Sequence, residues 1–309
     1  MSYLSDLIER FNKSFNPSDL FDELIECTKA NDIMIHNEKT GDGIFIVKGR
    51  KHQKRIENGR LKATVSRGKD VNQDVNSEVS LSRALFNADR INLPDNGTNG
   101  EPRQMELISF EAPLLRRSHG IGKREIKCDL IGIEKTEKEL NIFAIEVKNR
   151  AGKNTNISYA IPEAFAYGIV LGKYLMDENM KKLVIKQINA AQIWKSRELK
   201  KEDIEDKNCS CPVCHVYPIV LAPRDYWKTQ LSSNETLEKY QNLKEMFTVK
   251  LNDENLSSCL SMPSYWVLPS GEVKFDDDSN IPELKKLDDI QSYNSLEEVK
   301  RGIYSQNNL

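Results

Sequence analysis

The sequence has few cysteines and no long apolar run. Six cysteines in 309 residues are too few for a disulfide scaffold, so we expect a reducing, cytoplasmic compartment. No segment approaches the roughly 18 consecutive apolar residues of a membrane span. Residues 1–15 form a polar amphipathic stretch without the apolar centre of a signal peptide. These absences predict a soluble globular protein with no membrane partner.

The sequence also lacks a large excess of either charge and the common nucleotide-binding motifs. Its 45 lysines and arginines and 47 aspartates and glutamates leave a net charge of −2. Affinity for nucleic acid would therefore have to come from local basic patches. We find no Walker-type phosphate loop, no glycine-rich dinucleotide fingerprint and no internal repeat.

Charged residues interrupt two apolar segments near the middle of the chain. Residues 126–133 and 140–147 are apolar on both faces, which is typical of strands covered on both sides of a sheet. Asp129, Glu146 and Lys148 stand within or directly after them. A buried charge without a partner or a metal ion is strongly unfavourable. These three charges therefore require an explanation.

Their spacing places the three residues on one face. Glu146 and Lys148 are two residues apart, so on a strand they point the same way. If Ile133 pairs with Leu140 across the intervening turn, Asp129 lies diagonal to Glu146 on that same face. A shift of the register by one residue would move Asp129 to the opposite face. The sequence thus predicts both a strand pairing and a shared site.

Two carboxylates and a lysine on one face suit metal-assisted hydrolysis of a phosphodiester. Hard oxygen ligands, with water completing the shell, favour Mg²⁺ or Mn²⁺. Such an ion polarises the scissile phosphate and lowers the pKa of a bound water. A lysine beside it orients or helps to deprotonate that water, or stabilises the developing negative charge. The alternative is a hairpin with an ordinary ion pair between a carboxylate and a lysine.

Asp129 followed by Glu146-Val147-Lys148 on the next apolar strand resembles the PD-(D/E)XK nuclease superfamily. The resemblance covers roughly residues 75–225, and Cys128 stands where the strict pattern has proline. It implies an α/β restriction-endonuclease-like core, with a mixed central β-sheet flanked by helices and with N- and C-terminal elaborations. It also implies that Asp129, Glu146 and the Val147 carbonyl bind Mg²⁺ or Mn²⁺ and that Lys148 positions the attacking water.

The resemblance further implies an accessory acid for the metal site. A helix before the sheet often supplies one in this superfamily, and Glu78 lies in the first turn of the helix predicted over residues 77–89. Glu111, on a strand predicted over residues 105–115, is the rival candidate. A first-turn glutamate also stabilises a helix by complementing its dipole, so Glu78 has a structural alternative.

A long apolar helix is predicted after the second strand, from about Pro162, which suits a first turn, to about Met176. Glu163 and Tyr167 are four residues apart and share a face of this helix. Several branches of the superfamily have a Gln-x-x-x-Tyr pair here that supports the site. The resemblance therefore implies a supporting role, with glutamate in place of glutamine. The alternative is a helix-start acid and a buried tyrosine.

Two basic segments are candidates for contact with a phosphate backbone. Such contacts give affinity that is independent of base sequence and weakens with salt, although charged segments are also found as ordinary solvated loops. Tyr226 and Trp227, at the end of a predicted strand, are a further candidate contact, but Trp227 equally suits the core. The candidate nucleic-acid-binding residues are Arg50, Lys51, Lys54 and Arg55 in one segment and Arg116, Arg117, Lys123 and Arg124 in the other.

Three cysteines and a histidine lie close together late in the chain. Cys209, Cys211, Cys214 and His215 are suited to hold Zn²⁺. Their spacing is not that of a usual zinc knuckle, and a second cysteine pair is missing. The alternatives are an unliganded loop of reduced thiols and an iron–sulfur cluster with Cys27 as the fourth ligand, as in some nucleases of this fold.

These patterns divide the chain into three parts. Residues 1–75 form an N-terminal α+β extension that includes a basic segment, residues 76–225 a nuclease-like core, and residues 226–309 a C-terminal extension of helix and hairpin. The strand over residues 105–115 is predicted to be the first of the sheet, after a loop over residues 91–104. Residues 265–268 and 272–275 are predicted to form a late hairpin.

We expect a Mg²⁺-dependent enzyme that cleaves DNA, most simply an endonuclease. The resemblance implies a role in restriction, phage defence or repair. A homodimer is one expected partner, since cutting both strands needs two sites, and an ATPase or helicase subunit is another. The first alternative is a catalytically silent nucleic-acid-binding or assembly subunit on the same fold. A zinc-stabilised scaffold without a nucleic-acid role is the second.

Overall fold

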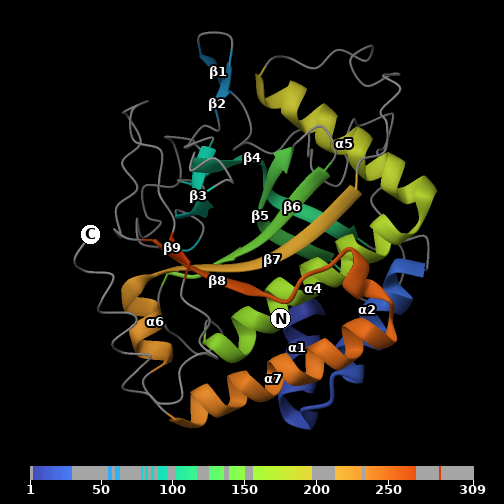
Figure 1. The fold of residues 1–309 in the computed structure, drawn as a ribbon, viewed down its shortest axis with the longest axis vertical. Coiled ribbons are helices and arrows are strands. Elements are labelled where there is room, and N and C mark those ends of the chain that lie inside the picture. The colour runs from blue at the N-terminus through green and yellow to red at the C-terminus, as the bar shows by residue number, and fades with distance from the viewer. Residues whose placement is uncertain are drawn as a thin grey trace.

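The computed structural model describes residues 3–29, 55–57, 60–62, 78, 81–82, 85–86, 90–96, 102–116, 125–135, 139–149, 156–196, 213–231, 234–268 and 285–286. Within these residues a curved sheet crosses the middle of the molecule, and helix α4 (Ile157–Met176) runs along one of its faces (Figure 1). Helices α1 (Tyr3–Ser14), α2 (Ser18–Lys29) and α7 (Asn234–Asp253) pack on the same side as α4. The predicted α/β class is confirmed.

Among the described residues, the main sheet has seven strands in the order β3-β4-β5-β6-β7-β8-β9. Neighbours are antiparallel except for the parallel pairs β6–β7 and β7–β8, so the sheet is mixed, as predicted. The parallel step from β6 to β7 requires a crossover, which contains α4 and α5 (Glu178–Ser196). The strands are β3 (Arg90–Asn96), β4 (Pro102–Arg116), β5 (Glu125–Lys135), β6 (Glu139–Val147), β7 (Val213–Pro223), β8 (Ser264–Leu268) and β9 (Lys285–Lys286).

The central strands are covered on both sides. Along β6, Leu140, Ile142 and Ala144 belong to the apolar cluster that contains α4, whereas Phe143 and Ile145 belong to a second cluster on the other face. The uninterrupted apolar run in the sequence is thereby explained, because alternate residues enter different cores. The second cluster also includes residues with helical backbone from the helix predicted before the sheet: Leu81, Leu85 and Phe86.

Helix α4 begins earlier than predicted. It starts at Ile157, so Pro162 lies inside the helix rather than in its first turn. Proline has no N–H for the carbonyl four residues back, which leaves the Ser158 carbonyl without its helical partner. The side-chain amide of Asn12, from α1, donates to that carbonyl at 3.1 Å. A contact with a distant helix therefore compensates for the proline, which no local pattern could show.

The edges of the sheet also differ from the predictions. Strand β3 occupies residues predicted to be a loop, so β4 is not the first strand. Its register is irregular between Asn92 and Asn96, around Pro94, and an edge strand tolerates a proline there. Strand β8 pairs in parallel with β7 and antiparallel with β9, and the second strand of the predicted hairpin, residues 272–275, lies outside the described residues.

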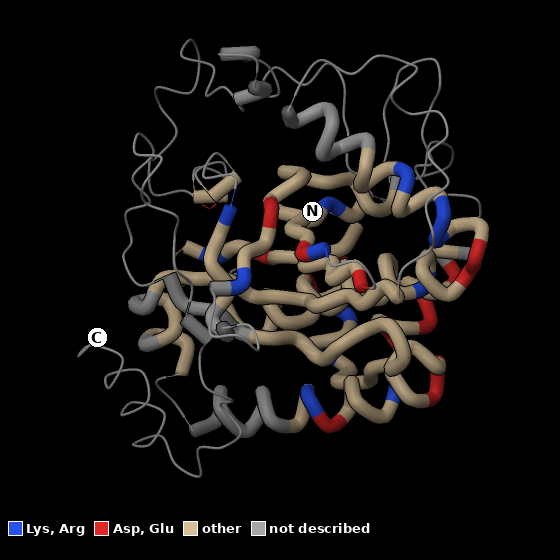
Figure 2. Tube along the Cα trace, turned by 45° about the horizontal axis from the view of Figure 1, so that its top comes forward, with Lys and Arg blue, Asp and Glu red and all other residues tan. Residues whose placement is uncertain are grey.

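Elements from both ends of the chain join the central core. Phe165 of α4 stacks on Phe247 of α7, with ring centroids 4.3 Å apart, and meets Phe21 of α2 at 5.2 Å. The remaining elements are a two-stranded sheet, β1 (Arg55–Glu57) and β2 (Arg60–Lys62), the helix α6 (Arg224–Gln230) and the 3-10 turn η3 (Leu256–Ser258). Figure 2 shows many charged residues on the outer helices and a group of both signs in the middle of the fold. Among the described helices, none has the length and apolar character needed to cross a membrane.

Candidate active site

Asp129 and Glu146 meet across the β5–β6 pair. Residues 130 and 145 form the last pair of the β5–β6 ladder at this end, and Asp129 and Glu146 are the next residues on the two strands. The predicted pairing of Ile133 with Leu140 is wrong, since Ile133 pairs with Ile142 and the ladder continues further into the charged turn. A shift of two residues keeps every side chain on its face. The two-residue error in the register therefore does not by itself move Asp129 to the other face of the sheet.

Around Asp129 on β5 and Glu111 on β4, the side chains no longer alternate regularly between the two faces of the sheet. Cys128 and Leu130 are two residues apart, yet they belong to apolar clusters on opposite faces of the sheet. On β4, Glu111 lies between the residues paired with these two, and its φ of 47° is in the left-handed region that such residues rarely adopt. At this break the carboxylate of Asp129 accepts the backbone N–H of Val147 at 2.9 Å.

Lys148 directly follows β6 and is held in the interior. Its backbone N–H donates to the Leu221 carbonyl of β7 at 2.9 Å, which fixes the end of the strand. Its side chain is only 5% exposed, and its Nζ lies 2.5 Å from Glu146 Oε1 and 2.8 Å from Glu163 Oε2. One buried ammonium therefore bridges a strand carboxylate and a helix carboxylate.

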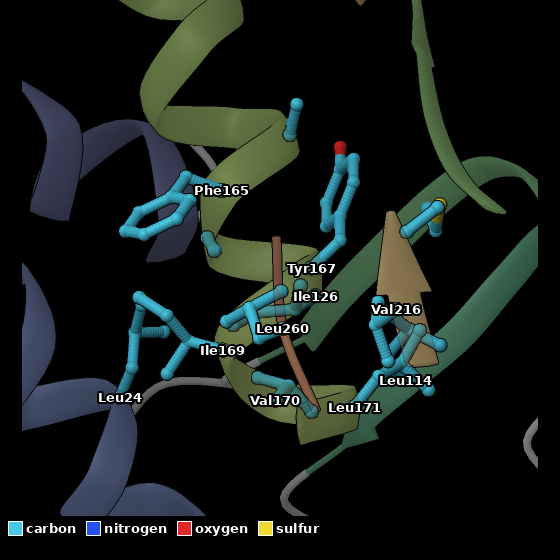
Figure 3. Packing of buried hydrophobic residues seen from close by; sticks show 14 of the residues in the cluster. Leu24, Leu114, Ile126, Phe165, Tyr167, Ile169, Val170, Leu171, Val216 and Leu260 are labelled. Carbon is cyan, nitrogen blue, oxygen red and sulfur yellow. The ribbon is translucent and has the colours of Figure 1, made fainter. Parts of the chain in front are cut away.

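Helix α4 brings Glu163 and Tyr167 to the same place. The Tyr167 hydroxyl donates to Glu146 Oε2 at 2.6 Å, and the Glu163 side chain hydrogen-bonds with Glu146 as well as with Lys148. A hydrogen bond between two carboxyl groups requires a proton on one of them. Figure 3 shows Phe165 and Tyr167 on different sides of α4, with the Tyr167 hydroxyl beyond the apolar side chains. The structure thus brings the predicted helix pair into contact with the strand residues.

Glu78 reaches the cluster from the helical segment before the sheet. Its Oε2 lies 4.0 Å from Lys148 Nζ, and the backbone N–H of Asn149 donates to its carboxylate. Its other oxygen, Oε1, is buried and has no hydrogen-bond partner within the described part of the chain. Glu111 lies on β4, between the residues that pair with the two neighbours of Asp129. Glu78 is therefore within reach of Lys148, and the choice between Glu78 and Glu111 as the accessory acid stays a prediction.

The cluster holds more carboxyl groups than its lysine can neutralise. Burial, and next the charge of Glu146, raise the pKa of Asp129 well above its usual range. The same two causes raise the pKa of Glu163 to about 8, and burial is the main cause of a raised pKa at Glu78. Among the described residues, four carboxyl groups share one lysine, and the raised pKa values of Asp129, Glu163 and Glu78 show that this setting disfavours the ionisation of all four at once.

Lys148 is protonated in this setting. Burial lowers its pKa, but the surrounding carboxylates, Glu146 first, outweigh burial and raise the pKa well above its usual value. Burial, with the charge of Glu146, also raises the pKa of Tyr167. An ammonium and a neutral phenol donate hydrogen bonds, so this geometry disfavours Lys148 as a base that deprotonates water. Orienting the water and stabilising negative charge stay as its predicted roles.

The donor set fits Mg²⁺ or Mn²⁺. Asp129 and Glu146 offer oxygens on paired strands, with the Val147 carbonyl next in the chain, and Mg²⁺ is commonly held by one or two carboxylates plus water and substrate phosphate. A divalent cation would also favour the ionised forms of these carboxyl groups. Among the described residues, no three His, Cys, Asp or Glu side chains form a ready-made cage for an ion, and Lys148 bridges Glu146 and Glu163.

The described part of the predicted zinc site does not converge. Cys214 and His215 are consecutive residues of β7, so their side chains point to opposite faces. Cys214 is buried in the cluster that contains α4, whereas His215 hydrogen-bonds Ser261 at 2.7 Å. The other proposed ligands, Cys209 and Cys211, and the side chain of Cys27 lie outside the described residues.

Most of the predicted nucleic-acid contacts also lie outside the described residues. Arg55 is in β1, and Arg116 ends β4, the strand next to the one that carries Asp129. Strand β4 continues beyond Glu111 and ends at Arg116. The predicted contacts beyond the described residues are Arg50, Lys51, Lys54, Arg117, Lys123 and Arg124.

Tyr226 is a residue near the site that the sequence suggested only as a surface contact. It lies in α6, directly after β7, where its buried ring meets Trp227 edge to face. Its hydroxyl has no hydrogen-bond partner among the residues that the structure describes. Burial is the main cause of its raised pKa, and the charges of Lys148 and Glu146 act on it next. The hydroxyl is therefore close to the cluster.

Residues from separate parts of the chain build this cluster: the helical segment at Glu78, the strand pair β5–β6 with Lys148, and the helix α4. These parts are far apart in the sequence and meet only in the folded chain. Comparison with known protein families, curated proteins and solved structures gives no significant match to the chain.

Proposed function

We propose that this chain is a metal-dependent nuclease that hydrolyses DNA phosphodiester bonds on a restriction-endonuclease-like core. The observation that carries the proposal is the convergence of Asp129, Glu146 and Lys148 at the end of two paired strands, with Glu163 and Tyr167 beside them. A structural ion pair needs one carboxylate for one lysine. An excess of buried carboxyl groups around a single ammonium is costly for stability, and such clusters are characteristic of functional sites.

In this proposal Asp129, Glu146 and the Val147 carbonyl hold Mg²⁺ or Mn²⁺, with Glu78 as the accessory acid. The bound ion supplies charge neutralisation at the scissile phosphate and a water of lowered pKa. Lys148 donates hydrogen bonds to the attacking water or to the phosphate, where it stabilises the negative charge that develops in the transition state. Tyr167 and Glu163 position Glu146 and Lys148 through the hydrogen bonds described above.

DNA is the favoured substrate and endonuclease action the favoured mode, in restriction, phage defence or repair. Arg116 and the basic residues outside the described part of the chain are proposed to contact the phosphate backbone. A homodimer would supply the second site that cutting both strands requires, and an ATPase or helicase subunit is the alternative partner. The described cysteines Cys128 and Cys259 are free thiols, which agrees with the proposed cytoplasmic location.

The experiment that tests the proposal is plasmid cleavage with Mg²⁺ or Mn²⁺. We expect Glu146→Gln and Lys148→Ala each to lose cleavage by about 10²-fold or more, because each removes a group that acts on transition-state charge. Glu139→Gln is the matched control, since Glu139 is an exposed glutamate at the other end of the same strand. It is expected to cleave like the native chain.

The variants must retain the native circular dichroism spectrum for the loss to be chemical. Equal cleavage by all of these chains would overturn the proposal, because the activity would then come from another site or from a contaminant. Loss in the Glu139→Gln control as well would show that removing any carboxylate from β6 is damaging, and it would remove the support for a specific site.

A catalytically silent nucleic-acid-binding or assembly subunit is the second candidate. The observation that favours it is the ion-pair network, in which Lys148 already bridges Glu146 and Glu163 at 2.5 and 2.8 Å. Such a subunit would bind DNA without cleaving it and would bind Mg²⁺ and Mn²⁺ only weakly. Calorimetric titration with both ions separates the candidates, because tight binding that is lost in Glu146→Gln supports the nuclease.

A further inference from the structure

Tyr226 carries a buried hydroxyl that the proposed chemistry has not used. The residue is 1% exposed, and its hydroxyl makes no hydrogen bond within the described part of the chain. A buried hydroxyl without a partner is destabilising, and phenylalanine would fill the same space without that penalty. The presence of the hydroxyl therefore indicates a partner that the described residues do not supply.

The elements around Tyr226 place it at the cluster. The carbonyl of Leu221, near the end of β7, accepts the backbone N–H of Lys148 at 2.9 Å, and α6 begins directly after this strand. The last residue of α6 is tied to the start of α4, because Gln230 Oε1 accepts the backbone N–H of Ile157 at 2.8 Å. Helix α6 is thus fixed to the strand end next to Lys148 and to the first turn of α4.

The ring of Tyr226 is held firmly in this position. Trp227 is fully buried and meets the Tyr226 ring edge to face, with centroids 5.3 Å apart. The hydroxyl lies within the electrostatic fields of Lys148, Glu146 and Glu78. A firmly held hydrogen-bond donor therefore lies in the same part of the fold as the carboxylates and the ammonium, without a hydrogen bond to any described residue.

We propose that the Tyr226 hydroxyl donates a hydrogen bond to a non-bridging oxygen of the scissile phosphate, next to the ammonium of Lys148. This inference rests on the proposed nuclease function and deepens it. Two donors side by side match an anion rich in oxygen acceptors, and a cation held by Asp129 and Glu146 allows that anion to approach the carboxylates. Tyr226 is then a catalytic residue that contacts the substrate, in contrast to Tyr167, which positions Glu146.

The test compares Tyr226→Phe with Tyr217→Phe. Tyr217 lies on β7 and packs against the cluster on the other face of the sheet, so its variant controls for the loss of a tyrosine hydroxyl from this region. We expect Tyr226→Phe to lower kcat for DNA cleavage by about 10²-fold, with KM changed by less than about threefold, because the bond strengthens as negative charge develops. Its melting temperature should equal or exceed that of the native chain, whereas a purely structural residue would lower it.

A second readout does not depend on cleavage. In the chain labelled with 3-fluorotyrosine, the ¹⁹F resonance that is missing from Tyr226→Phe belongs to Tyr226. A short DNA duplex with Ca²⁺, a hard oxygen-binding ion like Mg²⁺, should shift that resonance and leave the Tyr217 resonance in place.

The outcomes separate this inference from the function on which it rests. Native cleavage that persists unchanged in Tyr226→Phe overturns the role of Tyr226 and leaves the nuclease proposal standing. A native chain that does not cleave, but whose Tyr226 resonance shifts with DNA, supports the phosphate contact and overturns the nuclease proposal. A Tyr226 resonance that does not move with DNA overturns the contact whatever the cleavage assay shows.

Discussion

At the scale of single residues, Lys148 supplies the positive charge beside four carboxyl groups. Lys148→Met fills the same space and leaves these buried carboxyl groups uncompensated. We expect the free energy of unfolding to fall by about 3–5 kcal/mol, because breaking a buried pair exposes the full cost of the remaining charges. Urea unfolding in EDTA measures this loss.

Lys173→Met is the control for that change. Lys173 lies 3.0 Å from Glu254, and both side chains retain partial exposure, so its loss should lower stability by only about 1 kcal/mol. Similar losses of unfolding free energy in the two variants would mean that Lys148 compensates the buried carboxyl groups no more than a partly exposed lysine would.

The response to metal is the second prediction at this scale. Mg²⁺ that binds at Asp129 and Glu146 stabilises the native chain by mass action, by roughly 2–3 kcal/mol at about 100 times its Kd. Asp129→Asn retains an acceptor for the Val147 N–H but loses a charged ligand. We therefore expect Mg²⁺ to raise the unfolding midpoint of the native chain and of Glu139→Gln but not of Asp129→Asn. A rise in all three would place the bound ion elsewhere.

The sequence predicted the cluster residues better than their pairing. Asp129, Glu146 and Lys148 were placed on one face by the two-residue period of a strand, and an error of two in the register leaves that face unchanged. Tyr226 could not be assigned to the cluster in the same way. Its place depends on how α6 is tied to α4 through Gln230, and no local pattern encodes a contact across such a distance.

At the scale of elements, the proline in α4 gives a test of how a distant contact supports a helix. Asn12→Ala removes the donor to the Ser158 carbonyl, so we expect a loss of about 1–2 kcal/mol in the native background. Pro162→Ala restores a backbone N–H for that carbonyl. In the Pro162→Ala background, Asn12→Ala should cost clearly less, and a double-mutant cycle from urea unfolding measures the difference. Equal losses in both backgrounds would show that Asn12 acts elsewhere.

The central strands give a prediction about pH. Glu134 of β5 accepts hydrogen bonds from Arg103 of β4 at 2.7 Å and from Asn141 of β6 at 2.9 Å. The Arg103 hydrogen bond is the main cause of a pKa at Glu134 below its ordinary value of 4.5. A lowered folded-state pKa contributes stability that is present above the ordinary value and is lost as pH falls through the folded value.

Glu134→Gln should therefore be less stable than the native chain by about 1 kcal/mol at neutral pH, a modest figure because Arg103 is partly exposed. The difference should shrink as the pH falls below 4.5. Urea unfolding at a series of pH values follows it, and a difference that stays constant with pH would contradict the role of the ionised carboxylate.

Helices and strands were predictable from the sequence where their own residues determine the secondary structure. The runs that became β5 and β6 are apolar on both faces, and this pattern suffices for buried strands. The start of α4 and the parallel pairing of β8 with β7 depend instead on residues far away in the chain, such as Asn12 for the helix. Single-segment patterns carry no information about such partners.

At the scale of the whole molecule, one apolar cluster crosses the predicted boundaries at residues 75 and 225. It contains residues of α1, α2, α4, α7 and one face of the sheet. Four aromatic rings join the helices, with centroid distances of 4.3 to 5.8 Å: Phe11, Phe21, Phe165 and Phe247. Composition and charge indicated where the chain changes character, but they could not show that its outer parts pack on the central helix.

The last prediction concerns the independence of residues 76–225. A fragment with these limits loses the partners of Phe165 on α2 and α7, and α4 would then expose a large apolar surface. We expect no cooperative urea transition and little near-ultraviolet circular dichroism from the fragment, whereas the full chain unfolds in one transition.

In the full chain, Phe247→Ala should lower stability by about 3–5 kcal/mol without splitting that transition. A fragment that unfolds cooperatively would show that the core stands alone. Since α4 carries Glu163 and Tyr167, failure of the fragment would mean that both ends of the chain are needed to hold the candidate site together.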